Sequence, residues 1–361
     1  MPRIDADRIA VAFDMQGCPN RCRHCWLGPA SNRILSEADV RWGVSQFREY
    51  LSSASTPIRA LTVATWFREP DYHDDYRDLY ELEAQLGDGT PGRYELLSVW
   101  RLARDPGYAE WARSVGPDTC QISFFGLQET NDWFHRRNGA FADALTATER
   151  LLNAGMKPRW QLFLTTKLLP ELDGLLALVD QYRLRERVHD LGGEFRVFMH
   201  PPGPDHSARE IETLRPTIEQ VAGLPKALLA ATREHFGRDV LWKTEATLYA
   251  EILRDEATRI SAAILPGVLW FFVCSNWDVY SNIGTLEPWW RLGNLKQDSV
   301  ESIIRTFEED GVPGLRALFH ESTASLAQQH GDPTGQRIYS TREDLVALYR
   351  AKRCETEWRG R

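Results

Sequence analysis

Three cysteines near the beginning of the chain form the clearest chemical pattern in the sequence. Cys18, Cys22 and Cys25 are spaced C-x3-C-x2-C within the stretch FDMQGCPNRCRHCWLG. A structural zinc site needs four protein ligands, and His24, directly before Cys25, is poorly placed to join the same tetrahedron. A cubane [4Fe–4S] cluster is also held by thiolates. With three cysteines it keeps one iron open, where an amine and a carboxylate can bind.

The remaining cysteines stand alone in the sequence, at Cys120, Cys274 and Cys354. Six cysteines in 361 residues, half of them in one cluster, do not make a secreted disulfide scaffold. The longest apolar run, 262–274, is much shorter than the ~20 residues of a membrane helix. The N-terminus also lacks the apolar segment of a secretory signal. We therefore expect a soluble, cytoplasmic protein with no membrane partner.

The overall charge argues against a nucleic-acid partner. The formal net charge is −8 and the pI is about 5.7, with 43% hydrophobic and 26% charged residues. This composition is typical of a globular protein. Affinity for phosphate backbones comes mainly from clustered Lys and Arg, which the chain as a whole does not provide.

The cysteine motif lies in a chain whose predicted elements alternate between strand and helix. A capping box at Ser36 and Asp39 begins a helix over 36–52, and a second helix is expected over 141–154. The predicted strands are 9–13, 61–67, 94–100, 120–125, 160–166 and 194–199. Alternating strands and helices predict an α/β fold with a mainly parallel sheet. The cysteine motif directly follows the first strand, so it lies at the carboxyl edge of the sheet, where ligands bind.

The character of the chain changes after the Pro- and Gly-rich stretch HPPGPDHS. Residues 208–263 are predicted to be helical, followed by a hairpin with its turn near Asn276 and a helix over 298–310. We expect a domain boundary near residue 205, which separates a core domain, 1–205, from a helical linker and extension, 206–361.

The cysteine motif resembles the C-x3-C-x-aromatic-C signature of the radical S-adenosylmethionine (radical SAM) superfamily, with His24 at the aromatic position. The resemblance covers roughly residues 8–200. It implies a partial (β/α)6 radical SAM barrel, here with a small α+β C-terminal extension. It also implies a [4Fe–4S] cluster and S-adenosyl-L-methionine (SAM) as cofactors. In this superfamily the reduced cluster passes one electron to SAM, and the resulting 5′-deoxyadenosyl radical removes a hydrogen atom from a carbon.

The resemblance also suggests residues that contact SAM. Glu69, in TWFREP, matches the carboxylate of a Gly-Gly-Glu-Pro stretch, although Phe67 and Arg68 replace the two glycines. Ser123, in QISFFG, matches a position near the SAM ribose. In FHRRNG, Arg136 or Arg137 could pair with the SAM carboxylate, which suits a planar guanidinium. With His24, the cofactor-binding candidates are His24, Glu69, Ser123, Arg136 and Arg137.

The C-terminal third resembles the SPASM/twitch extensions of many radical SAM enzymes, through the hairpin and the Leu-Gly-Asn-Leu stretch at 292–295. Those extensions bind auxiliary clusters through several cysteines. Here only Cys274 and Cys354 are available, so we expect a degenerate extension without a second cluster. Cys274 is either a small buried residue or a hydrogen-atom donor to the substrate radical. Cys354 could take the same role if the C-terminal tail folds back, whereas Cys120 is expected in the core.

The resemblance implies an oxidoreductase, isomerase or lyase, and we expect one of natural-product biosynthesis. The expected substrate is a small polar metabolite, such as a sugar, aminocyclitol or nucleoside intermediate, that undergoes epimerisation, dehydration or oxidation. An electron donor such as flavodoxin or ferredoxin is the expected partner. Because the cysteine motif begins at residue 18, we expect no N-terminal peptide-recognition domain. A maturase of ribosomal peptides and a non-catalytic iron–sulfur or zinc protein remain the alternatives.

Overall fold

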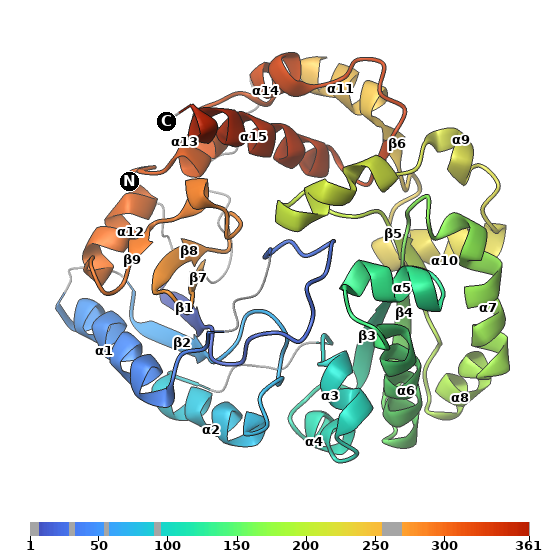
Figure 1. Ribbon diagram of the computed structural model, residues 1–361, viewed down its shortest axis with the longest axis horizontal. Coiled ribbons are helices and arrows are strands. Elements are labelled where there is room, and N and C mark those ends of the chain that lie inside the picture. Colours follow the sequence, from blue (N-terminus) through green and yellow to red (C-terminus); the bar gives the residue numbers. More distant parts are fainter. Residues whose placement is uncertain (1–6, 29–32, 54–57, 90–94, 255–268, 361) are drawn as a thin grey trace.

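Two β-sheets lie on either side of the loop that carries the cysteine motif (Figure 1). The computed structural model describes residues 7–28, 33–53, 58–89, 95–254 and 269–360. Helices surround both sheets on the outside, and the C-terminal helices lie together along one side of the molecule (Figure 1). The predicted α/β class with parallel strands is confirmed.

The first sheet is built around the first strand of the chain. Its strands, in the order β2-β1-β7-β8-β9, are Ala60–Ala64, Arg8–Phe13, Leu269–Val273, Asp278–Ser281 and Gly293–Asn294. β1 is parallel to both neighbours, and Val11 is in register with Val63 of β2 and with Phe271 of β7. The antiparallel pair β7–β8 is the hairpin predicted near Asn276. The last third of the chain therefore contributes strands to the same sheet as the first.

The second sheet has three parallel strands, in the order β3-β4-β5, which are Thr119–Phe124, Lys157–Phe163 and Val197–His200. Side chains alternate along β3, so that Cys120, Ile122 and Phe124 are buried while Gln121 and Ser123 are partly exposed. The buried face packs against helices α4 (Tyr108–Ser114), α6 (Ala140–Asn153) and α7 (Leu172–Gln181) to form a second core. Cys120 is thus a core residue, as expected.

The predicted strand over 94–100 is wrong. The structure has helix α3 at Val99–Arg104 instead, because the Ser98 side chain accepts a hydrogen bond from the backbone N–H of Arg101 and caps the helix. Residue 94 lies outside the described residues. Glu95 still lies beside β3, where its carbonyl accepts from the N–H of Gln121 at 2.8 Å. In the described residues the barrel of six strands is therefore not seen.

The free edge of β5 is covered by a helix. Helix α10, Lys226–Phe236, packs on β5, and the backbone N–H of Met199 donates to the Thr232 hydroxyl at 3.2 Å. This side-chain acceptor satisfies an edge donor that a further strand would otherwise pair.

The remaining helices follow the predicted pattern in outline. Helix α1 begins with the predicted capping box, in which Ser36 and Asp39 bond each other reciprocally, and it buries Val40, Val44 and Phe47. The helices before the change of character are α1 Glu37–Ser53, α2 Tyr76–Leu86, α4 Tyr108–Ser114, α5 Gln128–His135, α6 Ala140–Asn153, η1 Leu169–Glu171, α7 Leu172–Gln181 and α8 Leu184–Asp190. Those after it are η2 His206–Leu214, α9 Ile218–Val221, α11 Glu245–Arg254, η3 Pro288–Trp290, α12 Val300–Glu308, α13 Pro313–Phe319, α14 Thr323–His330 and α15 Arg342–Arg359, with the short strand pair β6 Lys243–Thr244 and β10 Ile338–Tyr339.

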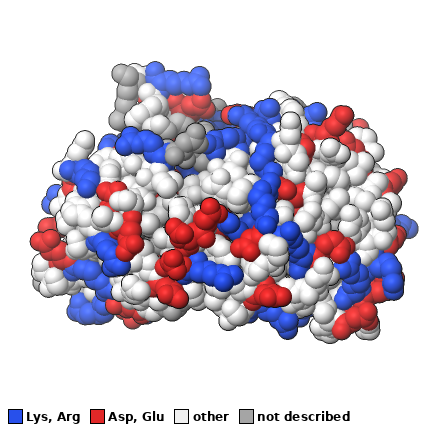
Figure 2. Space-filling view, turned by 60° about the horizontal axis from the view of Figure 1, so that its bottom comes forward, with Lys and Arg blue, Asp and Glu red and all other residues white. Residues whose placement is uncertain are grey.

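One hydrophobic core joins the two ends of the chain. Side chains of β1, β2 and α1 pack with side chains of β7, α12 and α13 in a single buried cluster. The boundary near residue 205 stays a prediction. Within the described residues, no helix has the length and apolar character needed to cross a bilayer. Among the residues coloured in Figure 2, acidic and basic side chains alternate across the face that is shown.

The contribution of β7 to this core can be measured with Phe271→Ala. Phe271 is fully buried, with its ring centroid 6.0 Å from that of Phe47. We expect the free energy of unfolding in urea to fall by about 3–5 kcal/mol, because the substitution removes a buried ring and leaves a cavity. The exposed Val240 provides the control, since Val240→Ala should change stability by less than about 0.5 kcal/mol. A loss below about 1 kcal/mol for Phe271→Ala would contradict the central position of β7.

Candidate functional site

The loop that carries the cysteines is fixed to the rest of the molecule by main-chain hydrogen bonds. It follows β1 and turns at Gly17, whose φ of +66° favours glycine. The backbone N–H groups of Arg21 and Arg23 donate to the carbonyls of His135 and Phe134, at 3.2 and 2.8 Å. The segment around Cys22 therefore runs along the end of α5, between the two sheets.

The three thiols lie close to one another in a poorly solvated place. Burial raises the pKa of Cys18 to about 12, and it also raises the pKa of Cys22 and of Cys25. The thiols of Cys18 and Cys25 each raise the pKa of Cys22, as expected of like charges brought together. A positive charge beside them, such as a metal centre supplies, would favour the thiolate form of these side chains.

In the described part of the chain, no three His, Cys, Asp or Glu side chains converge on a point where one metal ion could sit. A cubane does not need such convergence, because each of its thiolates binds a different iron.

His24 lies among aromatic rings. Its ring centroid is 4.2 Å from that of Phe125 and 5.0 Å from that of Phe163, which come from the carboxyl ends of β3 and β4. Burial, with a contribution from His135, holds the pKa of His24 well below its usual range, so the imidazole is neutral. Its Nδ1 is buried and has no hydrogen-bond partner in the structure. The neutral ring can therefore pack against a flat group and hydrogen-bond to it.

Glu69 lies beside the cysteine thiols. It follows β2, and its Oε1 accepts a hydrogen bond from the Ser98 hydroxyl at 2.7 Å. Burial raises the pKa of Glu69, whereas the hydrogen bond from Ser98 and the nearby Arg137 guanidinium lower it. Like burial, the Glu69 carboxylate raises the pKa of Cys18 and of Cys22. It therefore lies within electrostatic reach of both thiols.

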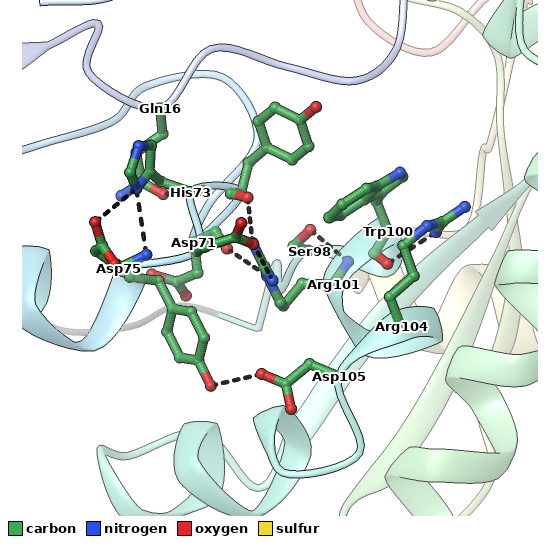
Figure 3. A network of polar contacts seen from close by, with 12 residues as sticks. Gln16, Asp71, His73, Asp75, Ser98, Trp100, Arg101, Arg104 and Asp105 are labelled. Carbon is green, nitrogen blue, oxygen red and sulfur yellow. Dashed lines mark hydrogen bonds and ion pairs between the residues drawn. The ribbon is translucent and has the colours of Figure 1, made fainter.

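A buried polar network holds the Glu69 loop in place (Figure 3). Asp71, in the left-handed region with φ of +52°, accepts a hydrogen bond from the Tyr108 hydroxyl at 2.7 Å. The Arg101 side chain donates to the Asp71 carbonyl at 3.2 Å, and the Arg101 N–H donates to Ser98. The N-terminus of α3, which replaces the predicted strand, is thus what orients Ser98 toward Glu69.

Arg68 connects the Glu69 loop to the cysteine loop. Its guanidinium donates to the Gly28 carbonyl at 2.9 Å, and its Nε lies 3.7 Å from the Asp14 carboxylate. The charge of Arg68 also lowers the pKa of Cys18 and Cys25 against the larger effect of burial. In the sequence Arg68 is visible only as a departure from two glycines, and no local pattern indicates Asp14 or Ser98. Their roles depend on contacts between distant segments.

The structure separates the two candidate arginines. Arg137 donates to the Asn20 side chain of the cysteine loop at 2.7 Å and pairs with Asp143 at 2.6 Å. Arg136 ends helix α5, is exposed and pairs with Glu210 at 2.7 Å. Arg137 is therefore brought to the cysteine loop, and Arg136 is not.

Ser123 lies on the partly exposed face of β3. Its hydroxyl is 3.3 Å from the Gln161 side-chain oxygen, which also accepts from Gln121 at 2.6 Å. Along β3 and β4 this polar layer lies two residues before Phe125 and Phe163, with the Phe124–Leu162 pair between them. Ser123 can therefore offer a hydroxyl to a molecule that occupies the space beside these strands.

Cys274 is brought to the same edge of the first sheet as the cysteine motif. It directly follows β7, and the N–H of Asp14 donates to the Val273 carbonyl at 3.1 Å. Burial raises the pKa of Cys274 to about 12, and the charge of Arg68 lowers it. Cys354 is different, because it is buried in α15 beside Arg350.

Comparison with known proteins gives structural matches alone. No family model matches the chain, and no curated protein matches it. The structure of anSMEcpe with bound AdoMet and the Cp18Cys peptide matches with 13% identity over 98% of this chain and 99% of that chain, with a TM-score of 0.48. Streptococcus suis SuiB bound to its precursor peptide SuiA matches with 11% identity over 84% and 65% of the two chains, with a TM-score of 0.46. These values assign no function to the chain.

Proposed function

We propose that this chain is a radical SAM enzyme that holds a [4Fe–4S] cluster through Cys18, Cys22 and Cys25. The observation that carries the proposal is that three neighbouring thiols lie close to Glu69 and Arg137, which come from different elements of the fold. When bound, the cluster supplies the electron that cleaves SAM reductively, and its open iron accommodates the amine and carboxylate of SAM.

Charged side chains of the site match the methionine part of SAM. The Glu69 carboxylate accepts hydrogen bonds from the amine, and the Arg137 guanidinium pairs with the carboxylate, which is a charge-assisted interaction. Ser98 and Asn20 hold these two side chains through the hydrogen bonds described above. The two charges therefore need little reorientation when SAM binds, which lowers the cost of binding.

The nucleoside part of SAM finds a different environment. His24, Phe125 and Phe163 supply flat, poorly hydrated surfaces on which an adenine can pack. Ser123 supplies a hydroxyl for the ribose. Exclusion of water by these rings protects a carbon radical from side reactions.

Cys274 is the proposed hydrogen-atom donor for the last step. In that step the S–H bond of Cys274 breaks and a C–H bond forms on the substrate radical, which leaves a thiyl radical on sulfur. An external one-electron donor and a proton then restore the thiol. The thiol is suited to this role because burial keeps it protonated at neutral pH.

Two classes of substrate are candidates, a small polar metabolite and a ribosomal peptide. The two similar structures described above hold peptides, so they give no support to the small polar metabolite expected from the sequence. A ribosomal peptide is therefore tested together with sugars, aminocyclitols and nucleosides. A true substrate should raise the rate of 5′-deoxyadenosine formation and should take up or lose a hydrogen that mass spectrometry detects.

The cluster assignment predicts different outcomes for two cysteines. After anaerobic reconstitution with iron and sulfide, Cys22→Ala should bind less iron than the wild type and form no 5′-deoxyadenosine from SAM and dithionite. Cys120→Ala removes a cysteine from the core, away from the site, and should keep both. If wild-type protein loaded with about four irons forms no 5′-deoxyadenosine, the non-catalytic alternative is correct.

The adjacent arginines offer a matched pair for SAM binding. Arg137→Ala should raise the dissociation constant of SAM roughly 10- to 100-fold, because it removes charge-assisted hydrogen bonds worth about 1.5–3 kcal/mol. Arg136→Ala removes an exposed ion pair and should leave the dissociation constant within about twofold. Equilibrium dialysis of the reconstituted variants measures both. Equal effects of the two substitutions would exclude Arg137 from the SAM site.

Cys274→Ala separates radical formation from the quenching of the substrate radical. With a substrate in hand, this variant should form 5′-deoxyadenosine at a rate near that of the wild type while product formation stops. In heavy water, wild-type product should carry deuterium from the exchangeable thiol. Normal product formation by Cys274→Ala would remove this cysteine from the mechanism.

A further inference from the structure

One arginine of the C-terminal helix makes no hydrogen bond or ion pair with any residue that the structure describes. This residue is Arg350 on α15, and its Nε is buried without a partner. Burial lowers the pKa of Arg350 to about 10. Proteins rarely leave buried donors unused, and a buried charge is costly unless it is paired. Arg350 therefore indicates a binding partner that the chain itself does not supply.

Asp205 is a carboxyl group in the same situation. It precedes η2 without capping it, and its side chain accepts no hydrogen bond from the described residues. Burial raises the pKa of Asp205 to about 6, and the charges of Arg209 and Arg350 oppose this rise. The Asp205 charge in turn opposes the effect of burial on Arg350. Arg350 and Asp205 are thus within electrostatic reach of each other, yet no ion pair joins them in the described part of the chain.

The other charged side chains nearby already have partners within the chain. Arg209 forms an ion pair with Glu287, and Glu321 forms one with Arg353 at 3.2 Å. Asp344 accepts a backbone N–H in the capping box of α15. One guanidinium and one carboxyl group are therefore left without a partner, and they carry opposite charges.

Two further buried donors lie in this region. Arg209 Nη1 and Trp289 Nε1 have no hydrogen-bond partner in the structure, and the Arg209 guanidinium carbon lies 5.6 Å from the Trp289 ring centroid. Trp289 belongs to η3, which packs against α15, the helix of Arg350. An unused buried donor is costly, so three of them in one region indicate a polar ligand.

The region lies beside the cysteine loop. His206 follows Asp205, and a Cβ at position 28 would come within 2.2 Å of the His206 ring, so the imidazole packs directly on the Gly28 backbone. The Gly28 N–H donates to the carbonyl of Cys25 at 3.1 Å. A molecule held by Asp205 therefore lies next to the loop that binds the cluster in the proposed function.

We propose that Arg350 and Asp205 bind the substrate, and that the substrate carries a carboxylate with an amine or amide N–H next to it. The Arg350 guanidinium pairs with the carboxylate, and the Asp205 carboxylate accepts a hydrogen bond from the N–H group. A free amino acid and the C-terminal residue of a peptide both present these two groups. A phosphate ester fits less well, because its extra negative charge would repel Asp205. The inference rests on the proposed function, since it names the substrate class of that enzyme.

The experiment uses the reconstituted, SAM-loaded enzyme and two sets of probes. The first set is the free amino acids found in proteins, and the second is random tripeptides. Each set is prepared with a free carboxylate and, for comparison, as the C-terminal amide. Saturation-transfer NMR identifies the probes that bind, and titration gives the dissociation constant of the strongest one. Because SAM occupies its own site, an amino acid does not bind there.

The wild type should bind the free acid about tenfold or more tightly than the matching amide. Arg350→Gln should raise the dissociation constant of the acid by about tenfold or more and abolish this preference, and Arg350→Lys should restore part of it. Asp205→Ala should weaken binding but keep the preference, because Arg350 remains. The control Arg359→Gln removes an exposed guanidinium from the same helix and should leave the dissociation constant within about twofold.

A merely structural role of Arg350 would give a different result. Loss of a structural residue would lower the urea midpoint of unfolding and weaken the binding of acids and amides alike. Arg350→Gln should instead keep the urea midpoint and the dissociation constant of SAM close to those of the wild type, because it removes a buried charge that has no partner in the chain.

The two probe sets distinguish the sources of the recognised group. Binding of amino acids alone identifies a metabolite, binding of tripeptides alone identifies a peptide, and either supports the proposal. The proposal is overturned if neither set binds, if acids and amides bind the wild type equally, or if Arg350→Gln keeps the preference for acids. A wild-type enzyme that binds the probes but forms no 5′-deoxyadenosine from SAM and dithionite would overturn the proposed function and leave the binding site standing.

Discussion

The parallel pairing of β1 with both β2 and β7 is the constraint on which the rest of the structure depends. Parallel strands end at the same edge of a sheet, so the segments that follow them meet there. The cysteine motif follows β1, Glu69 follows β2, and Cys274 follows β7. The buried core that β1 shares with α1, α12 and α13 keeps this edge fixed. A site made from segments more than two hundred residues apart therefore depends on the packing of one central strand.

The second sheet completes the site from the opposite side. The end of α5 pairs with the cysteine loop through main-chain hydrogen bonds and delivers Arg137 to Asn20. The ends of β3 and β4 provide the rings around His24, and α3 orients Ser98 toward Glu69. Charged groups thus surround the proposed position of the methionine part of SAM, and apolar rings surround that of the nucleoside. This division follows from the local chemistry of the two sheets.

Sequence patterns predicted the local features well and the long-range ones poorly. The helix beginning at Ser36 and the hairpin near Asn276 each depend on neighbouring residues, and the structure has both. The prediction of a strand over 94–100 is wrong. The apolar residues of this segment resemble a β pattern, but the Ser98 cap favours a helix. Which of Arg136 and Arg137 reaches the cysteine loop depends on the left-handed φ of Arg136 at the end of α5, and no local sequence pattern predicts that φ.

The central claim is that three thiolates hold a cluster whose remaining iron binds SAM. Electron paramagnetic resonance of the anaerobically reconstituted and reduced protein, recorded with and without SAM, tests it most directly. The account predicts the signal of a reduced [4Fe–4S] cluster, with g values that change when SAM is added, because SAM then occupies the open iron. A cluster signal that is insensitive to SAM, or a protein that takes up zinc in place of iron, would contradict it.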